Sequence, residues 1–179
     1  MFWGAKGVSG HSCSFADSPA RIYYSEMISS VKIIAFKPEY QKAAAELVNR
    51  GLGEHFGRVD ESINPDLFDI GLNYRDGDFM LAFCGEQLIG TGSLMPIVEG
   101  VGQIARMHTA TEHRRQGVAS SMLATLEKQA VTRNFHTVIL ETNTDWFEAI
   151  TFYERNGYVE MNRNELGIRF HRPLEATVS

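Results

Sequence analysis

Residues 109–123 combine basic, polar and glycine side chains where an apolar, strand-like run should become a helix. They read TATEHRRQGVASSML, with Arg114, Arg115, Gln116 and Gly117 at the junction. The first turn of a helix carries backbone N–H groups without intrahelical partners and the positive end of the helix dipole. Glycine allows close approach to the backbone, and arginine suits phosphate oxygens. The stretch therefore predicts a pyrophosphate site, and the alternative is a solvated basic loop that opens an ordinary helix.

The elements that would hold this stretch follow from hydrophobic periodicity. After the junction, apolar residues four apart give one stripe and predict the clearest helix of the chain: Val118, Met122, Leu126 and Ala130. β-branched and apolar runs predict strands, with a hairpin turn at CGEQ between the second and the third. The predicted strands cover residues 31–37, 78–85, 87–97, 102–110, 136–142, 158–161 and 168–174.

Two further helices are predicted on either side of this central part. Pro38 suits the first turn of one helix, which we expect to end at Gly51 and Gly53. Asp145, with Glu148 three residues later, predicts the start of another, and Gly157 predicts its end. Residues 54–70 are loop-like, and a short helix within them is the alternative. The order of elements predicts one α/β domain whose sheet mixes antiparallel hairpins with a parallel crossover.

Composition limits the classes of protein that the chain can represent. A length of 179 residues with 44% hydrophobic and 22% charged residues suits a single globular domain with a full core. The net charge of −5 argues against a nucleic-acid binder, and no apolar run is long enough to span a membrane. Cys13 and Cys84 are the only cysteines, so a reducing, cytoplasmic location is expected. The glycine- and serine-rich residues 1–30 predict a peripheral arm, with Met27 as an alternative initiator.

The junction and a second stretch together resemble the GNAT (Gcn5-related N-acetyltransferase) superfamily. RRQGVA, residues 114–119, matches its Gln/Arg-x-x-Gly-x-Gly/Ala signature, within a longer match over residues 106–123. AITFYERNGY, residues 149–158, resembles a later helix of the family and the strand after it. The resemblance covers about residues 31–173. It implies a GNAT domain over residues 31–179, with a mixed sheet of about six to seven strands, a splayed parallel pair and flanking helices.

The resemblance also implies acetyl-coenzyme A (acetyl-CoA) as cofactor, with its pyrophosphate on backbone amides of residues 115–120. The strand that carries Met107 and Thr109 would splay from residues 138–142, and the pantetheine arm would lie in the gap. The amide of Met107 would then meet the thioester carbonyl, as a fixed donor does in an oxyanion hole. The implied cofactor-binding residues are Met107, His108, Thr109, Arg114, Arg115, Gln116, Gly117, Val118, Ala119, Ser120, Asn143 and Tyr153.

Amine acetylation needs a proton donor for the departing thiolate and a base that leaves the amine neutral. Tyr153 matches the family position of the proton donor; without the motif, a tyrosine on an amphipathic helix is more often a core residue. Glu141 and His108 are candidate bases, and a chain of water molecules is the alternative. Glu54 and His55 lie in a stretch that often walls the acceptor site in this family, although either fits an ordinary surface residue.

Several positions depart from the family pattern. His108 stands where many relatives carry tyrosine, and Gln103 stands near a frequent glutamate, which leaves the base open. Trp146 replaces a frequent asparagine, so Asn143 is the candidate for that cofactor contact.

GVGQIA, residues 100–105, imitates a dinucleotide fingerprint, but a strand follows it where a helix is required. The six histidines show no metal-ligand spacing, and no metal is expected.

Three functions follow from this pattern. The first is an acetyl-CoA-dependent N-acetyltransferase that acetylates a primary amine of a small molecule or amino acid by direct attack in a ternary complex. The second is a non-catalytic domain that binds and senses acyl-CoA. The third is acetylation of a protein N-terminus or lysine. Relatives are often dimers, so a homodimer is one form to expect.

Overall fold

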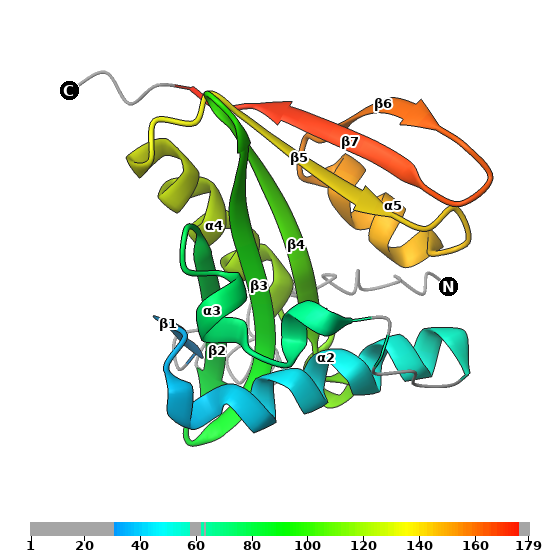
Figure 1. The fold of residues 1–179 in the computed structure, drawn as a ribbon. Coiled ribbons are helices and arrows are strands. Elements are labelled where there is room, and N and C mark those ends of the chain that lie inside the picture. Colours follow the sequence, from blue (N-terminus) through cyan, green and yellow to red (C-terminus); the bar gives the residue numbers. More distant parts are fainter. Residues whose placement is uncertain (1–30, 58–61, 63, 176–179) are drawn as a thin grey trace, which may run out of the picture.

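The computed structural model of the protein describes residues 31–57, 62 and 64–175, and the arm expected over residues 1–30, with Met27, lies outside the described residues. Figure 1 shows the elements. The strands are β1 (Val31–Ala35), β2 (Asp78–Cys84), β3 (Gln87–Val98), β4 (Val101–Thr109), β5 (Thr137–Thr142), β6 (Val159–Arg163) and β7 (Ile168–Pro173). The α-helices are α2 (Gln41–Phe56), α3 (Ile70–Asn73), α4 (Val118–Thr132) and α5 (Phe147–Arg155). Short 3-10 turns are η1 (Pro38–Tyr40), η3 (Pro65–Leu67) and η4 (Thr111–His113).

The strands form one mixed sheet in the order β1-β2-β3-β4-β5-β7-β6. All neighbouring strands are antiparallel except β4 and β5, which are parallel and are joined by the crossover through α4. This confirms the predicted fold class. Residues 101–105 of GVGQIA lie within β4, so this stretch is not a turn that opens a helix and does not form a dinucleotide fingerprint. The predicted strand ends are correct to within one or two residues.

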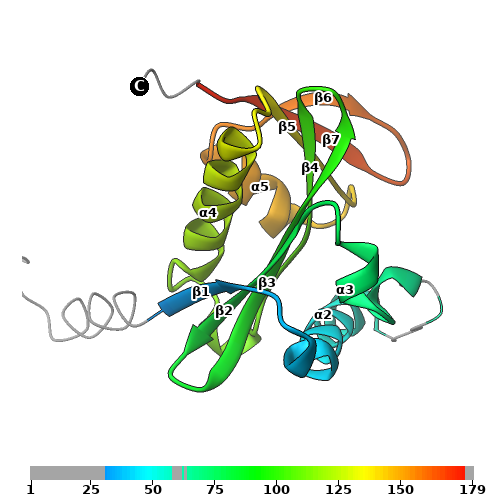
Figure 2. The same ribbon diagram turned by 60° about the vertical axis from the view of Figure 1, so that its left-hand side comes forward.

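Helices cover both faces of the sheet. Figure 2 shows α4 and α5 on one side and α2 with α3 on the other. The stripe that predicted α4 is buried on the first face, where Met122 and Leu126 pack with Ile89 and Leu94 of β3. On the second face, Val48 of α2 packs against Phe79 of β2. The sheet is therefore held between two apolar layers.

Two predicted helix ends are wrong, and contacts with the rest of the fold explain both. Helix α2 does not stop at Gly51 and Gly53; it continues to Phe56 and ends at Gly57, whose φ of 72° suits a glycine. Helix α5 begins after Trp146 without a side-chain cap, and the Asp145 carboxylate instead lies 3.3 Å from His55 of α2. The predicted stop at Gly157 is confirmed by its φ of 81°.

The parallel pair separates along its length. Strands β4 and β5 pair only from Val101 to Gln103 on one side and from Thr137 to Ile139 on the other. Beyond this point β5 continues to pair with β7 as far as Thr142. Figure 1 shows β4 and β5 together at one end and far apart at the other. The expected splay is therefore present, and its open end lies beside the start of α4.

Candidate active site

Two cavities open where β4 and β5 separate. One, of about 630 Å³, lies between α2, the second half of β4 and the end of β5; we call it the acceptor cavity. The other, of about 940 Å³, lies between the start of α4 and α5; we call it the cofactor cavity. They meet, because the same five residues line both: Met107, His108, Trp146, Ala149 and Tyr153.

The cofactor cavity brings together most of the residues expected to bind acetyl-CoA. Ten of the twelve line it: Met107, His108, Thr109, Arg114, Arg115, Gly117, Val118, Ala119, Ser120 and Tyr153. The other two lie elsewhere. Asn143 lines the acceptor cavity, and Gln116 donates from Nε2 to the carbonyl of Glu112 at 3.0 Å.

The start of α4 leaves backbone N–H groups available. Its N-cap is Gly117, with a φ of 81° and no side chain to bond the first-turn amides, and no other side chain of the described residues caps this end. Arg115, two residues earlier, also has a positive φ, 60°. Successive amides at a turn and a helix start form an anion-binding concavity. The backbone therefore fits a pyrophosphate, as the motif predicts.

The two arginines at this turn differ in how firmly they are held. The guanidinium of Arg114 donates from Nη2 to Glu54 at 2.6 Å and from Nε to the carbonyl of Thr109 at 3.2 Å. Arg115 makes an exposed ion pair with Glu148 at 3.1 Å, and its side chain is 88% exposed. Because an exposed pair is weak, Arg115 is the one that can turn to a bound anion at little cost.

Glu54 and His55 lie near the acceptor cavity without lining it. Besides Arg114, the carboxylate of Glu54 accepts a hydrogen bond from Thr111 at 2.8 Å, and these contacts, led by the one with Thr111, lower its pKa. The ring of His55 stacks on Trp146 with centroids 4.3 Å apart. Both residues thus connect α2 to elements of the cofactor side, and their contact with an acceptor stays a prediction.

Tyr153 lies at the junction of the two cavities. Its ring is buried against Tyr158 and Phe170, with centroids 5.7 and 6.2 Å away. Burial raises the pKa of its phenol well above the usual value. The hydroxyl is therefore protonated at neutral pH and has a proton to donate.

His108 is buried between β4 and α2. A Cβ at Gly51 would lie 1.2 Å from its Nε2, so only glycine fits the helix at this point. Burial, with Arg114, lowers the pKa of His108 to about 4. Nε2 has no hydrogen-bond partner among the described residues. The imidazole is therefore neutral at physiological pH and is a weak base.

The acceptor cavity is mainly apolar. Its apolar and aromatic lining includes Val48, Leu52, Phe56, Ile104, Trp146 and Ala149. Of the described residues, Glu141 supplies the one carboxylate in this lining, and Arg169 binds it through a hydrogen bond of 2.6 Å from Nε. The side chain of Glu141 is 48% exposed, so it connects the cavity with solvent.

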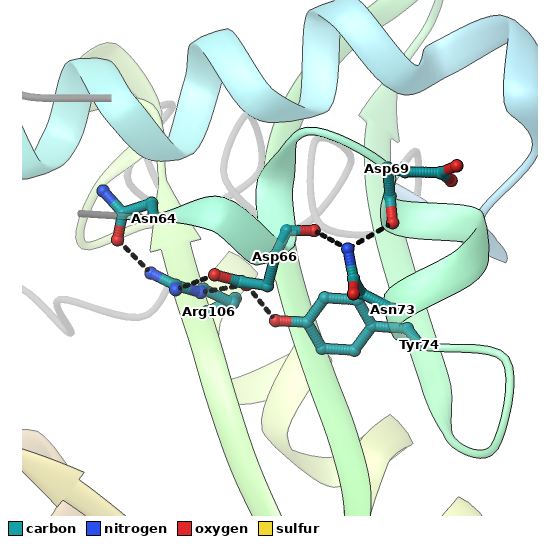
Figure 3. Close-up of polar contacts among 6 residues, drawn as sticks. All are labelled: Asn64, Asp66, Asp69, Asn73, Tyr74 and Arg106. Atoms are coloured by element: carbon teal, nitrogen blue, oxygen red, sulfur yellow. Dashed lines mark hydrogen bonds and ion pairs between the residues drawn. The ribbon is translucent and has the colours of Figure 1, made fainter. Parts of the chain in front are cut away.

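Sequence reasoning missed the polar group at the wall of this cavity. Arg106 of β4 and Asn64 both line it, and the guanidinium of Arg106 donates hydrogen bonds to Asn64 and to Asp66 (Figure 3). Asn64 and Asp66 come from the stretch that was expected to be loop. No periodicity or motif marks Asn64 or Asp66, and the family match that begins at Arg106 does not point to them. The buried apolar residues that α2 adds to the cavity could have been found from its helical spacing.

The part of the chain that the structure describes lacks both a cluster of metal-binding side chains and a helix that could span a membrane. Over residues 31–57, 62 and 64–175, no three histidine, cysteine, aspartate or glutamate side chains gather as a metal site. None of the helices in the same part of the chain is both long and apolar enough to cross a membrane.

Comparisons with known proteins agree with the geometry. N-acetyltransferase 8B of Rattus norvegicus is 32% identical over 108 residues, which cover 56% of this chain and 49% of that protein. This chain therefore matches about half the length of that relative. The structure resembles a GNAT-family acetyltransferase from Staphylococcus aureus, with a TM-score of 0.75, 22% identity, and coverage of 81% of this chain and 99% of the other.

A second similar structure was solved with a ligand bound. It is the PaiA N-acetyltransferase from Thermoplasma acidophilum in complex with coenzyme A, with a TM-score of 0.70, 16% identity, and coverage of 80% of this chain and 99% of the other. At these identities both structures support the fold alone. Residues 44–158, well over half of the chain, match the model of the acetyltransferase (GNAT) family. The chain belongs to the acetyltransferase (GNAT) family.

Proposed function

We propose that the chain transfers an acetyl group from acetyl-CoA to a primary amine of a small molecule or amino acid, by direct attack of the amine in a ternary complex. The observation that carries this proposal is the meeting of two cavities at Met107 and Tyr153. Two ligands bound in adjoining cavities can react without a covalent enzyme intermediate. Membership of an acetyltransferase family supports the choice of reaction.

The residues of the cofactor cavity fit acetyl-CoA. The amides of Gly117, Val118 and Ala119 would bind its pyrophosphate at the uncapped start of α4, and Arg115 would add a charged donor. When bound, acetyl-CoA supplies the acetyl group as a reactive thioester. The open gap between β4 and β5 would take the pantetheine arm, as the family resemblance implies.

Two groups at the junction would act on the reacting atoms. The backbone amide of Met107 would donate to the thioester oxygen, where negative charge grows as the amine attacks. A carbon–nitrogen bond forms and the carbon–sulfur bond breaks. Tyr153 would donate its phenolic proton to the departing thiolate, and its raised pKa keeps that proton in place until then.

The acceptor cavity favours an amine on an apolar body. Its apolar walls disfavour a charged ammonium, so they promote the neutral amine that can attack. Glu141 would accept the proton of the amine directly or through water, because it joins the cavity to solvent. His108 is less suited to this role, since its ring is buried between β4 and α2 and has little exposed surface through which to pass the proton to solvent. We assign it to the wall of the cavity.

The test is thiol release by the full chain with acetyl-CoA and a panel of acceptors, alongside calorimetric binding of acetyl-CoA. The panel holds an arylalkyl primary amine, a polyamine, an amino acid and a peptide with a free N-terminus. We expect binding, and the fastest release with the arylalkyl amine. Binding without release for any acceptor would favour the sensing domain, and release with the peptide alone would favour protein acetylation. Absence of acetyl-CoA binding would overturn the proposal.

A further inference from the structure

The backbone of β4 is irregular beside the junction of the cavities. Thr91 of β3 pairs with His108 and Ser93 pairs with Ala105, so Gly92 alone faces both Arg106 and Met107. This is a β-bulge, and Arg106 adopts a φ of 52° in it. Such a left-handed conformation is unfavourable for a residue with a Cβ, and it persists where surrounding contacts hold it.

Hydrogen bonds hold Arg106 at both its backbone and its side chain. Its carbonyl accepts from the buried hydroxyl of Thr91 at 2.8 Å. Its guanidinium donates to both carboxylate oxygens of Asp66, at 2.9 and 2.5 Å, and from Nη1 to Asn64 at 2.9 Å (Figure 3). A bidentate arginine–carboxylate pair fixes orientation as well as distance.

A second layer holds Asp66 in turn. Tyr74 donates its hydroxyl to the Asp66 carboxylate at 2.6 Å, and Asn73 donates to the Asp66 carbonyl at 3.2 Å and to that of Asp69 at 2.9 Å (Figure 3). Burial, followed by the bond to Asp66, raises the pKa of Tyr74 to about 12, so the phenol stays a donor. The network thus ties η3 and α3 to the bulge.

Arg133 is held by a similar set of hydrogen bonds, which shows that a well-bonded arginine side chain does not by itself indicate function. Arg133, at the end of α4, donates from Nε to Asp78 at 2.6 Å and to the carbonyls of Asp76 and Gly77 at 3.1 and 2.9 Å. It lies in a regular helix end and lines neither cavity. Arg106 differs because it lines the acceptor cavity and directly precedes Met107 at the bulge.

We propose that Arg106 is a positioning residue: the clamp of Asp66 and Asn64 on its guanidinium fixes the β4 bulge and thereby orients the amide of Met107 toward the junction of the two cavities. This inference rests on the proposed function for its effect on turnover. Its effect on the backbone is independent of that function.

The test compares Asp66→Asn, which keeps the shape but weakens the charged bidentate pair, with Arg133→Gln as the matched control. The first readout is the amide resonance of Met107 with and without coenzyme A. We expect Asp66→Asn to broaden or shift this resonance and Arg133→Gln to leave it unchanged. An unchanged Met107 resonance in Asp66→Asn would overturn the proposal, whether or not the chain turns over any amine.

The second readout is turnover. We expect Asp66→Asn to lower kcat about tenfold with a KM for acetyl-CoA within about twofold, while Arg133→Gln keeps kcat. An equal loss of kcat in both variants would reduce the clamp to a structural role.

If Asp66→Asn fails to fold, Tyr74→Phe removes one bond to Asp66 and should lower kcat about twofold to threefold; unchanged kcat would again contradict the proposal. A wild-type chain without turnover refutes the proposed function, and the Met107 resonance still decides on the clamp.

Discussion

The two halves of β4 have different partners and different tasks. From Val101 to Gln103 the strand pairs on both sides, with β3 and with β5. From Ile104 to Thr109 it keeps β3 alone, carries the bulge and lines the cavities. The first half contributes to stability because its backbone is paired on both sides. In the second half β4 and β5 are no longer paired, and the gap lies beside both cavities.

The difference shows how one strand can be both rigid and open. The paired half fixes the direction in which β4 and β5 separate, and contacts outside the sheet then hold the open half. Both contacts come from the face of the sheet that α2 and α3 cover. They are the hydrogen bonds between Arg106 and Asp66 and the packing of Gly51 against His108. Substitutions in the paired half should therefore change stability, and those in the open half should change catalysis.

Tyr153→Phe should give the largest catalytic effect. The phenol is the group that we assign as proton donor, and its loss should lower kcat about 100-fold, or about 3 kcal/mol, with affinity for acetyl-CoA within about twofold. Steady-state kinetics and calorimetry measure the two. The matched control is Tyr158→Phe, which removes a hydrogen bond to Glu127 at 2.9 Å and should lower stability alone. Equal rates for Tyr153→Phe and wild type would remove the assignment.

Two glycines allow the paired and the open half of β4 to be compared: Gly102 lies in the paired half, and Gly92 of β3 lies opposite the open half. A Cβ at Gly102 would lie 2.6 Å from Phe135, and one at Gly92, opposite the bulge, would lie 2.9 Å from the sulfur of Met107. We expect Gly102→Ala and Gly92→Ala each to cost about 2 kcal/mol of unfolding free energy through overpacking. Only Gly92→Ala should also lower kcat, several-fold. Denaturant unfolding and kinetics on both variants test this, and the same kcat in both would contradict the division.

Acid should weaken the open half through His108. Its pKa of about 4 in the folded protein lies below the usual 6.5, so the unfolded chain binds the proton first as the pH falls. Stability contributed by the neutral imidazole is complete above pH 6.5 and is lost toward pH 4. At pH 5.5 the loss is about 1 kcal/mol. Urea unfolding at pH 7 and 5.5 should show this difference between wild type and His108→Phe; parallel pH dependence in the two proteins would exclude it.

Arg115→Ala should give the smallest change in stability. The exposed pair with Glu148 contributes less than about 0.5 kcal/mol. Loss of a charged donor should nevertheless weaken acetyl-CoA binding about fivefold, or about 1 kcal/mol. Arg163→Ala, which breaks an exposed pair with Glu160 away from both cavities, is the control for calorimetry. Equal affinity in both variants would show that Arg115 does not reach the cofactor.

Much of the fold could be predicted from local pattern. The α4 stripe and the strand alternation are properties of neighbouring residues, and they gave these elements correctly. The end of α2 was wrong because Gly51 usually breaks a helix, whereas here it makes room for the ring of His108, 57 residues later. The start of α5 was wrong for the same kind of reason, since Asp145 approaches His55 on α2 and does not cap the helix.

The site was predictable where a motif marks it and not elsewhere. The glycine-bearing turn and Tyr153 stand in short recognisable stretches, and the structure brings both to one cavity. The clamp could not be predicted, because Arg106 and Asp66 are 40 residues apart and Asp66 stands in a segment without periodicity. The bulge at Arg106 has no sequence signal either, since arginine rarely adopts a positive φ.

Backbone amide chemical shifts, followed while the full chain is titrated with acetyl-CoA, report which backbone N–H groups bind the cofactor. We expect the largest changes on Met107 in the open half of β4 and on Gly117, Val118 and Ala119 at the start of α4, with little change at Val101–Gln103 in the paired half. Saturable binding with those amides unperturbed, or with the largest changes outside the two cavities, would contradict this expectation.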